Sequence, residues 1–190
     1  MQGKNKHAKG LEGSLLSAAN IREQLMAELS HFNINYIAAA IDTDPDHFNT
    51  IMHFVLHDKD PVPPRAAWVA EIVSGKNPTL IDPYIEDIIS GLDNYTHPGT
   101  RRNMLKILMR TEIPEYLQGL LIDICFQWIM DDHKKVAAKV YAIQIIENHL
   151  PLYPELAVEL SEVIRDQFNK NSAGFRSRGR KVLNNLKKYL

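Results

Sequence analysis

Apolar residues recur at helical spacing along nearly the whole chain. The first such stripe is Ala18, Ile21, Leu25 and Leu29, with steps of three and four residues. Stretches of strand length in which apolar and polar residues alternate are not found, and β-branched residues rarely cluster. The pattern therefore predicts an all-α protein.

Prolines mark the expected starts of one set of helices. Four of them each stand just before an apolar helical pattern, at separations of 38, 31 and 40 residues: Pro45, Pro83, Pro114 and Pro154. Proline fits the first turn of a helix because its missing N–H would have no partner there. Asp44 and Asp82 precede the first two prolines, and we expect both to cap the helices that follow.

A second helical pattern follows each of these helices. Three copies lie 36 residues apart: Trp68, Val69, Ile72 and Val73; Met104, Leu105, Leu108 and Met109; and Val140, Tyr141, Gln144 and Ile145. The last copy, from Phe175 to Leu190, is looser but still amphipathic. The sequence thus predicts a paired-helix unit of about 36 residues, a period that stacked α-solenoids show.

The proline-initiated first helices and the second helix over residues 131–141 resemble HEAT and armadillo repeats. That second helix reads Asp-Asp-His-Lys-Lys-Val-Ala-Ala-Lys-Val-Tyr, and it departs from the usual pattern at Ala137, where such repeats carry Arg or Lys. The resemblance covers residues 15–190. It implies a right-handed α-α superhelix of about four to five stacked helix pairs, in which neighbouring pairs bury one another's apolar stripes. We expect one repeat domain over 15–190, preceded by a flexible leader over 1–14.

Charge is distributed unevenly along the chain, although the formal net charge is only −1. Residues 14–169 carry 22 acidic and 12 basic side chains. Residues 170–190 contain no acid and seven basic residues: Lys170, Arg176, Arg178, Arg180, Lys181, Lys187 and Lys188. Such segregation points to a polyanion or an acidic partner surface, or else to the solvated outer face of a terminal helix.

Composition narrows the class of protein. Hydrophobic residues make up 45% of the chain and charged residues 24%, which excludes wholesale disorder. The single cysteine, Cys125, excludes an intramolecular disulfide and a cysteine-rich zinc site. No apolar run approaches the roughly 20 residues of a membrane span, and the first residues do not form a secretory signal. We expect a cytoplasmic protein with no membrane partner.

No catalytic motif is found. The segment from Gly174 to Lys181 approaches a phosphate-binding loop, but it has Arg180 where that loop needs Lys and no hydroxyl residue after it. Nucleophile elbows, His-Glu-x-x-His motifs and dinucleotide fingerprints are missing, as is the Ser-Ser-x-Met-Pro-x-Lys-x-Asn loop of adenylosuccinate lyase-type enzymes. We therefore expect neither an enzyme nor a cofactor.

One group of residues has the spacing of metal ligands. His53 and His57 stand one helical turn apart and share a stripe with Asp46. No Glu adjoins either histidine as a general base, and exposed helix faces commonly carry histidines. We expect no metal, and these three residues are the candidate should one bind.

The interpretation that follows is a non-catalytic scaffold or adaptor that binds another protein. The expected contacts lie on the second helices and on the basic last helix: Arg65, Arg101, Arg102 and Lys139, and Arg176, Arg178, Arg180 and Lys181. The alternative is a nucleic-acid-binding module that uses the basic C-terminal helix and the second-helix arginines, through release of counterions. The acidic body opposes a long duplex track.

Overall fold

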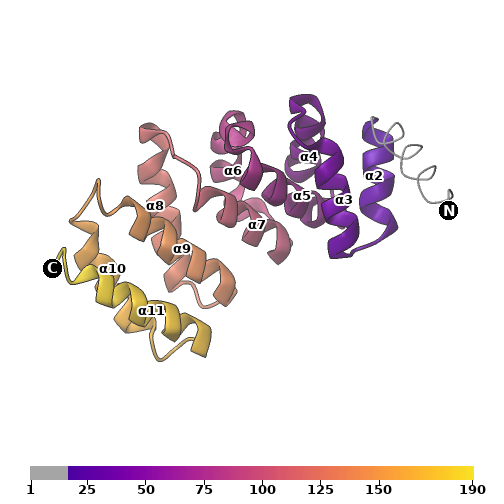
Figure 1. Ribbon diagram of the computed structural model, residues 1–190. Helices are drawn as coiled ribbons and strands as arrows, with labels where there is room; N and C mark the ends of the chain where they lie inside the picture. The colour runs from indigo at the N-terminus through magenta and orange to yellow at the C-terminus, as the bar shows by residue number, and fades with distance from the viewer. Residues whose placement is uncertain (1–16) are drawn as a thin grey trace, which may run out of the picture. The chain divides into compact units, whose positions relative to one another are not determined.

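The computed structural model describes residues 17–190, so the expected leader over 1–14 lies outside the described residues. Within that range all regular structure is helical. The described residues divide into two compact units between Met104 and Leu105. This point lies inside helix α7, which is labelled in Figure 1. The domain predicted over 15–190 therefore comprises two units.

The first unit contains three successive helix pairs. Its elements are α2 (Ala18–Ala27), α3 (His31–Ile41), α4 (Pro45–His57), α5 (Val62–Lys76), the 3₁₀ segment η1 (Pro78–Tyr84), α6 (Ile85–Gly91), the 3₁₀ segment η2 (Leu92–Asn94) and α7 (Pro98–Leu108). Helix α5 packs against its partner α4 and also against α3 and α2 of the preceding pair. Packing between neighbouring pairs thus forms the core of this unit.

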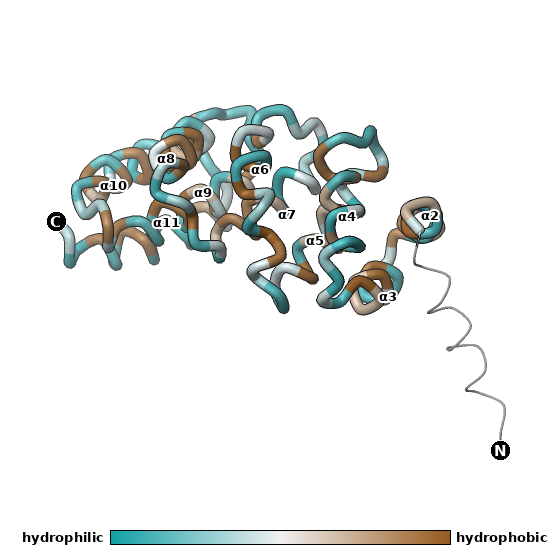
Figure 2. Tube along the Cα trace, turned by 90° about the horizontal axis from the view of Figure 1, so that it is seen from above, coloured by the Kyte–Doolittle hydropathy of each residue, from teal (hydrophilic) through white to brown (hydrophobic). Residues whose placement is uncertain are grey.

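The second unit contains two further pairs. Its elements are α8 (Glu115–Met130), α9 (Val136–His149), α10 (Leu156–Gln167) and α11 (Ala173–Leu186). Helix α9 packs against α8, and α11 packs against both α9 and α10. Figure 2 shows hydrophobic stretches recurring along these helices. With the three pairs of the first unit, residues 17–190 confirm the prediction of four to five helix pairs.

The first proline prediction is confirmed in atomic detail. Helix α4 begins at Pro45, and Oδ1 of Asp44 accepts hydrogen bonds from the backbone N–H groups of Asp46 at 2.9 Å and His47 at 3.2 Å. These are two of the amides that a helix leaves unpaired in its first turn. Helix α8 begins one residue after Pro114, and α10 begins two residues after Pro154.

At Pro83 a helix, α6, begins two residues after the proline, as α10 does after Pro154, but the predicted cap at Asp82 is wrong. Pro83 lies inside η1, and the short helix α6 begins only at Ile85, so Asp82 caps no α-helix. The prolines at 78 and 83 each remove an N–H donor, and the segment adopts the tighter 3₁₀ form that short irregular stretches favour.

The first apolar stripe also ends earlier than expected. Helix α2 stops at Ala27, and Leu29 is 61% exposed in the connection that follows. Oγ of Ser30 accepts a hydrogen bond from the backbone N–H of Asn33 at 3.1 Å and so begins a separate helix, α3. Leu29 therefore lies between two helices, although its spacing continues the stripe of α2.

Side-chain hydrogen bonds join residues one repeat length apart. In the first unit the pairs are Arg22–Asp58, Arg65–Leu25, Asn77–Asp42, Tyr84–Asn49 and Thr96–Asp60, separated by 35 to 40 residues. In the second unit they are Asn148–Met109, Tyr153–Gln118 and Asn185–Glu147, separated by 35 to 39. Within each unit the polar residues therefore follow about the same period as the apolar ones and join neighbouring helix pairs.

Candidate protein-binding surface

Helix α11 has one buried face. Phe175, Gly179, Val182 and Leu186 are buried, at steps of four, three and four residues. A Cβ atom at Gly179 would lie 3.0 Å from Cγ2 of Ile164 and 3.6 Å from the ring of Phe168. The glycine therefore allows α11 to approach α10 more closely than a larger residue would.

Two arginines of α11 are used within the second unit. Nη1 of Arg176 donates to the carbonyl of Asn171 at 2.6 Å. Nη2 of Arg178 donates to Oε2 of Glu147 on α9 at 2.6 Å, and the same carboxylate accepts from Asn185 through Oε1 at 2.7 Å. Arg176 and Arg178, both predicted as partner contacts, are half-buried and hold α11 in place.

The remaining positive charges of the segment gather on the opposite side. Arg180, Lys181, Lys187 and Lys188 are all exposed, and we call them the basic face of α11. At about 100° per residue they span about 120° around the helix axis, and along it they extend about 12 Å. Helical hydrogen bonding continues past Leu186: the backbone N–H of Leu190 donates to the carbonyl oxygen of Leu186 at 3.2 Å. The expected contacts do not include Lys187 and Lys188, although the helical phase of the two lysines places them on the same side as Arg180 and Lys181.

A depression of about 410 Å³ adjoins the basic face. Its lining combines polar and apolar groups: Glu147, Asn148, Leu150, Pro151, Asn185, Lys188 and Tyr189. Nζ of Lys188 lies 4.7 Å from the centre of the Tyr189 ring. A partner that pairs with the lysines can therefore also bury a side chain beside Tyr189 and Pro151.

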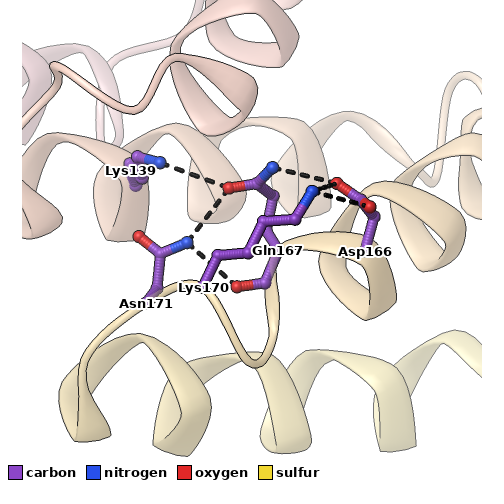
Figure 3. Close-up of polar contacts among 5 residues, drawn as sticks. All are labelled: Lys139, Asp166, Gln167, Lys170 and Asn171. Atoms are coloured by element: carbon purple, nitrogen blue, oxygen red, sulfur yellow. Dashed lines mark hydrogen bonds and ion pairs between the residues drawn. The ribbon is translucent and has the colours of Figure 1, made fainter.

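Lys139, predicted as a partner contact, is only 1% exposed and is not available to a partner. Its Nζ donates to Oε1 of Gln167 at 3.4 Å, and Nδ2 of Asn171 donates to the same oxygen at 3.0 Å (Figure 3). Burial lowers the pKa of Lys139, while Asp132 and Asp131 act in the opposite direction. The apolar spacing of α9 places this lysine on the face that packs into the unit.

Lys170 is paired near the end of α10. Its Nζ bonds to both carboxylate oxygens of Asp166, at 2.9 and 2.8 Å (Figure 3). Of the seven basic residues in the last segment, Lys170, Arg176 and Arg178 thus have partners within the second unit. The four residues of the basic face are the ones that project outward.

The second-helix arginines belong to the first unit. Nη1 of Arg65 donates to the carbonyl of Leu25 at 2.7 Å, and Nη2 of Arg101 donates to the carbonyl of Tyr95 at 2.5 Å. Both side chains are half-buried, whereas Arg102 is exposed. Arg65 and Arg101 therefore support the backbone of the unit, and the structure does not gather the three arginines into a charged row.

The candidate metal ligands do not form a site. His53 and His57 are exposed with ring centres 4.9 Å apart, but Asp46 lies two turns earlier on α4. Across residues 17–190 no three His, Cys, Asp or Glu side chains are placed to hold a metal ion together. Cys125 is buried in α8, and burial raises the pKa of its thiol, as expected for a packing residue.

None of the helices described over 17–190 combines the length and the apolar character that crossing a bilayer requires.

Comparison with known proteins gives one match. A family model described as a HEAT repeat domain matches residues 21–186. No curated protein and no solved structure matches the chain. The match extends through both units and agrees with the paired helices and their repeat-length hydrogen bonds.

Proposed function

Because the chain belongs to the HEAT repeat family, we propose that it is a non-catalytic adaptor that binds an acidic segment of another protein through the basic face of α11. HEAT repeats generally serve as scaffolds for protein interaction. One observation carries the assignment to this face: in residues 17–190, Arg180, Lys181, Lys187 and Lys188 make no ion pair, although acids outnumber bases in the rest of the chain.

The electrostatics of the basic face favour an anionic partner. Four positive charges within about 12 Å repel one another, and carboxylates placed opposite them relieve that repulsion. An exposed ion pair contributes only about 0.2–1 kcal/mol, so the charges chiefly steer the encounter and fix its orientation. The depression beside Tyr189 supplies the apolar contact that charge alone does not give.

A protein segment fits this face better than a nucleic acid. The basic face extends for about 12 Å along one helix, which is less than half a turn of duplex DNA. Arg65 and Arg101, which the nucleic-acid alternative requires, are bonded to backbone carbonyls. Tracking a phosphate backbone requires many cations in a row.

The test compares two labelled probes by fluorescence anisotropy on the full chain. One probe is a Glu-rich peptide with a single Tyr, and the other is a DNA duplex of arbitrary sequence. The test variant is R180E/K181E/K187E/K188E. Its control, K59E/K76E/R102E/K135E, makes the same charge change at four other exposed positions.

We expect the peptide to bind the wild type and the control alike, and the test variant at least tenfold more weakly. Equal peptide binding by the test variant would overturn the proposal. Binding of duplex in preference to peptide, lost in the same variant and with a steep salt dependence, would overturn it in favour of the nucleic-acid alternative.

A further inference from the structure

Three large apolar side chains are exposed where α2 meets α3. Met26 is 40% exposed, Leu29 61% and Phe32 81%. They lie at the end of α2, in the connection and at the start of α3, and we call them the α2–α3 corner. Stacked repeats usually end in a pair whose outer face is polar, and apolar patches that stay exposed mark interaction surfaces.

Helices α3 and α5 correspond residue by residue at an offset of 36. Four positions of α3 and their counterparts in α5 are buried in both helices: Asn33 and Val69, Ile34 and Ala70, Ile37 and Val73, and Ala38 and Ser74. The same offset makes Arg65 the counterpart of Leu29. It makes Trp68 the counterpart of Phe32.

Both counterparts contact the preceding helix pair. Nη1 of Arg65 donates to the carbonyl of Leu25 on α2 at 2.7 Å. The ring of Trp68 stands edge-on to the ring of His31 on α3, with 4.6 Å between the ring centres. In residues 17–190 no helix pair precedes α2 and α3. The α2–α3 corner therefore has the register of a surface that packs against a neighbour, and within the described residues that neighbour is missing.

The chain around the α2–α3 corner is acidic. Residues 17–46 contain five acidic side chains and one basic side chain, Arg22, which forms an ion pair with Asp58. Glu23 and Glu28 are exposed, and among the described residues neither of them forms an ion pair. The corner thus combines apolar side chains with unmatched negative charge.

The surface of α11 is the complement of this corner. Its basic face carries four positive charges, and the adjoining depression of about 410 Å³ is lined in part by Pro151 and Tyr189. Opposite charges beside matching apolar groups fix both the partner and its orientation. Because one chain carries both complementary surfaces, a second copy of this protein is the partner that the charges favour.

We infer that the α2–α3 corner of one copy binds the basic face of α11 of a second copy. Phe32 enters the depression beside Tyr189, while Glu23 and Glu28 face the lysines. The contact is heterologous, because it joins two different surfaces. The inference rests on the proposed function, since it uses the same basic face and identifies the acidic segment as part of a second copy.

The contact should be weak. Stable interfaces bury about 1,200–2,000 Å², and three apolar side chains with a few exposed ion pairs fall below that range. Self-association should therefore rise with protein concentration, and added salt should weaken it because salt screens the exposed charges.

Sedimentation velocity of the full chain, from micromolar to near-millimolar protein, tests the inference. L29S/F32S alters the α2–α3 corner, and R180E/K181E/K187E/K188E reverses the basic face. The control L120S/L152S removes two exposed leucines of the second unit. All the altered side chains are exposed, so thermal unfolding of each variant should resemble that of the wild type.

We expect the mean mass of the wild type and of the control to rise with concentration, and each test variant to associate at least tenfold more weakly. An equimolar mixture of the two test variants should form a dimer and nothing larger, because one variant keeps the basic face and the other keeps the corner. A wild type that stays monomeric would overturn the inference, as would a mixture that does not associate. Self-association of the basic-face variant alone would also overturn it, because two corners would then pair with each other.

Binding of the Glu-rich peptide separates this inference from the proposed function. L29S/F32S keeps the basic face and should bind the peptide like the wild type at concentrations where the wild type is monomeric. Peptide binding without self-association would overturn the inference and leave the proposed function standing. Self-association without peptide binding would do the reverse.

Discussion

Nη2 of Arg178 on α11 lies 2.6 Å from Oε2 of Glu147 on α9, and the two side chains are only 18% and 14% exposed. The carboxylate also accepts hydrogen bonds from Gln144 and Asn185. This half-buried ion pair fixes α11 against α9 and so determines which side of the helix presents its charges outward. Two arginines two positions apart on one helix, Arg178 and Arg180, consequently have different roles.

R178A should lower the free energy of unfolding by about 2 kcal/mol, because it leaves the Glu147 carboxylate without its charged partner. R180A removes an exposed side chain and should change stability by less than about 0.5 kcal/mol. Urea unfolding of the two variants checks the difference. Equal stabilities would show that the ion pair does not contribute.

K139M should stabilise the protein by about 1 kcal/mol or more. Burial lowers the pKa of Lys139, so the folded state disfavours its charged form. Gln167 keeps a partner for its Oε1 in Asn171, so the substitution leaves no new buried group unpaired. Thermal and urea unfolding at neutral pH measure the gain, and a loss of stability would contradict the burial argument.

The same lysine gives a pH dependence with a definite sign. Because its folded pKa lies below the ordinary value of 10.5, the unfolded chain binds the proton more tightly. The contribution of Lys139 to stability is therefore most favourable above pH 10.5 and falls as the pH drops through the interval down to the folded pKa. We expect the advantage of K139M over the wild type to shrink as the pH approaches 10.5, and a constant difference would contradict the assignment.

G119A should stabilise the protein by roughly 0.5–1 kcal/mol. Gly119 lies in the second turn of α8, a Cβ there would meet nothing within 4 Å, and Ala has the higher helix propensity. G179A has the same intrinsic gain, but its Cβ would press on Ile164 at 3.0 Å and offset it. Thermal unfolding of the two variants compares open space with close packing in one protein, and equal gains would show that α11 can shift.

The ion pair between Arg22 and Asp58 should make the free energy of unfolding depend on pH in the acid range. The side-chain hydrogen bond from Arg22 holds the pKa of Asp58 below its ordinary value of 3.8. The stabilisation is therefore present above pH 3.8 and is lost as the pH falls through the folded pKa. D58N and R22Q should each abolish this part of the pH dependence, and the double variant should add nothing further, as urea unfolding between pH 2 and pH 5 would show.

The helical class and the repeat period could be predicted from the sequence because both depend on apolar spacing, which burial enforces. Asp44 and Pro45 correctly predicted the start of α4 because an N-cap acts only on the backbone amides of the turn that follows it. Asp82 was misleading because an acidic residue before a proline does not show whether the turn that follows is α or 3₁₀. Leu29 was wrongly included in the first stripe because its spacing from Leu25 is helical, although α2 ends at Ala27 and a new helix is capped by Ser30.

The sites were harder to predict. Arg178 and Arg180 look alike in the sequence, and only the position of Glu147, 31 residues earlier, distinguishes them. Lys139 carries a charge on a face that the fold buries, which composition cannot reveal. A pocket in the first unit brings together residues of the α4–α5 connection and of α6 and α7, which no single motif encodes.

The side-chain bonds that span one repeat length have a mechanical consequence. Each of them fastens a helix pair to the pair beside it and reaches no further along its unit. When the protein is stretched, the force acts on several separate contacts between helix pairs. The weakest contact breaks first, while the others remain intact. A single molecule stretched from its ends should therefore lengthen in steps of about one repeat, and it should recover those steps when the force is released.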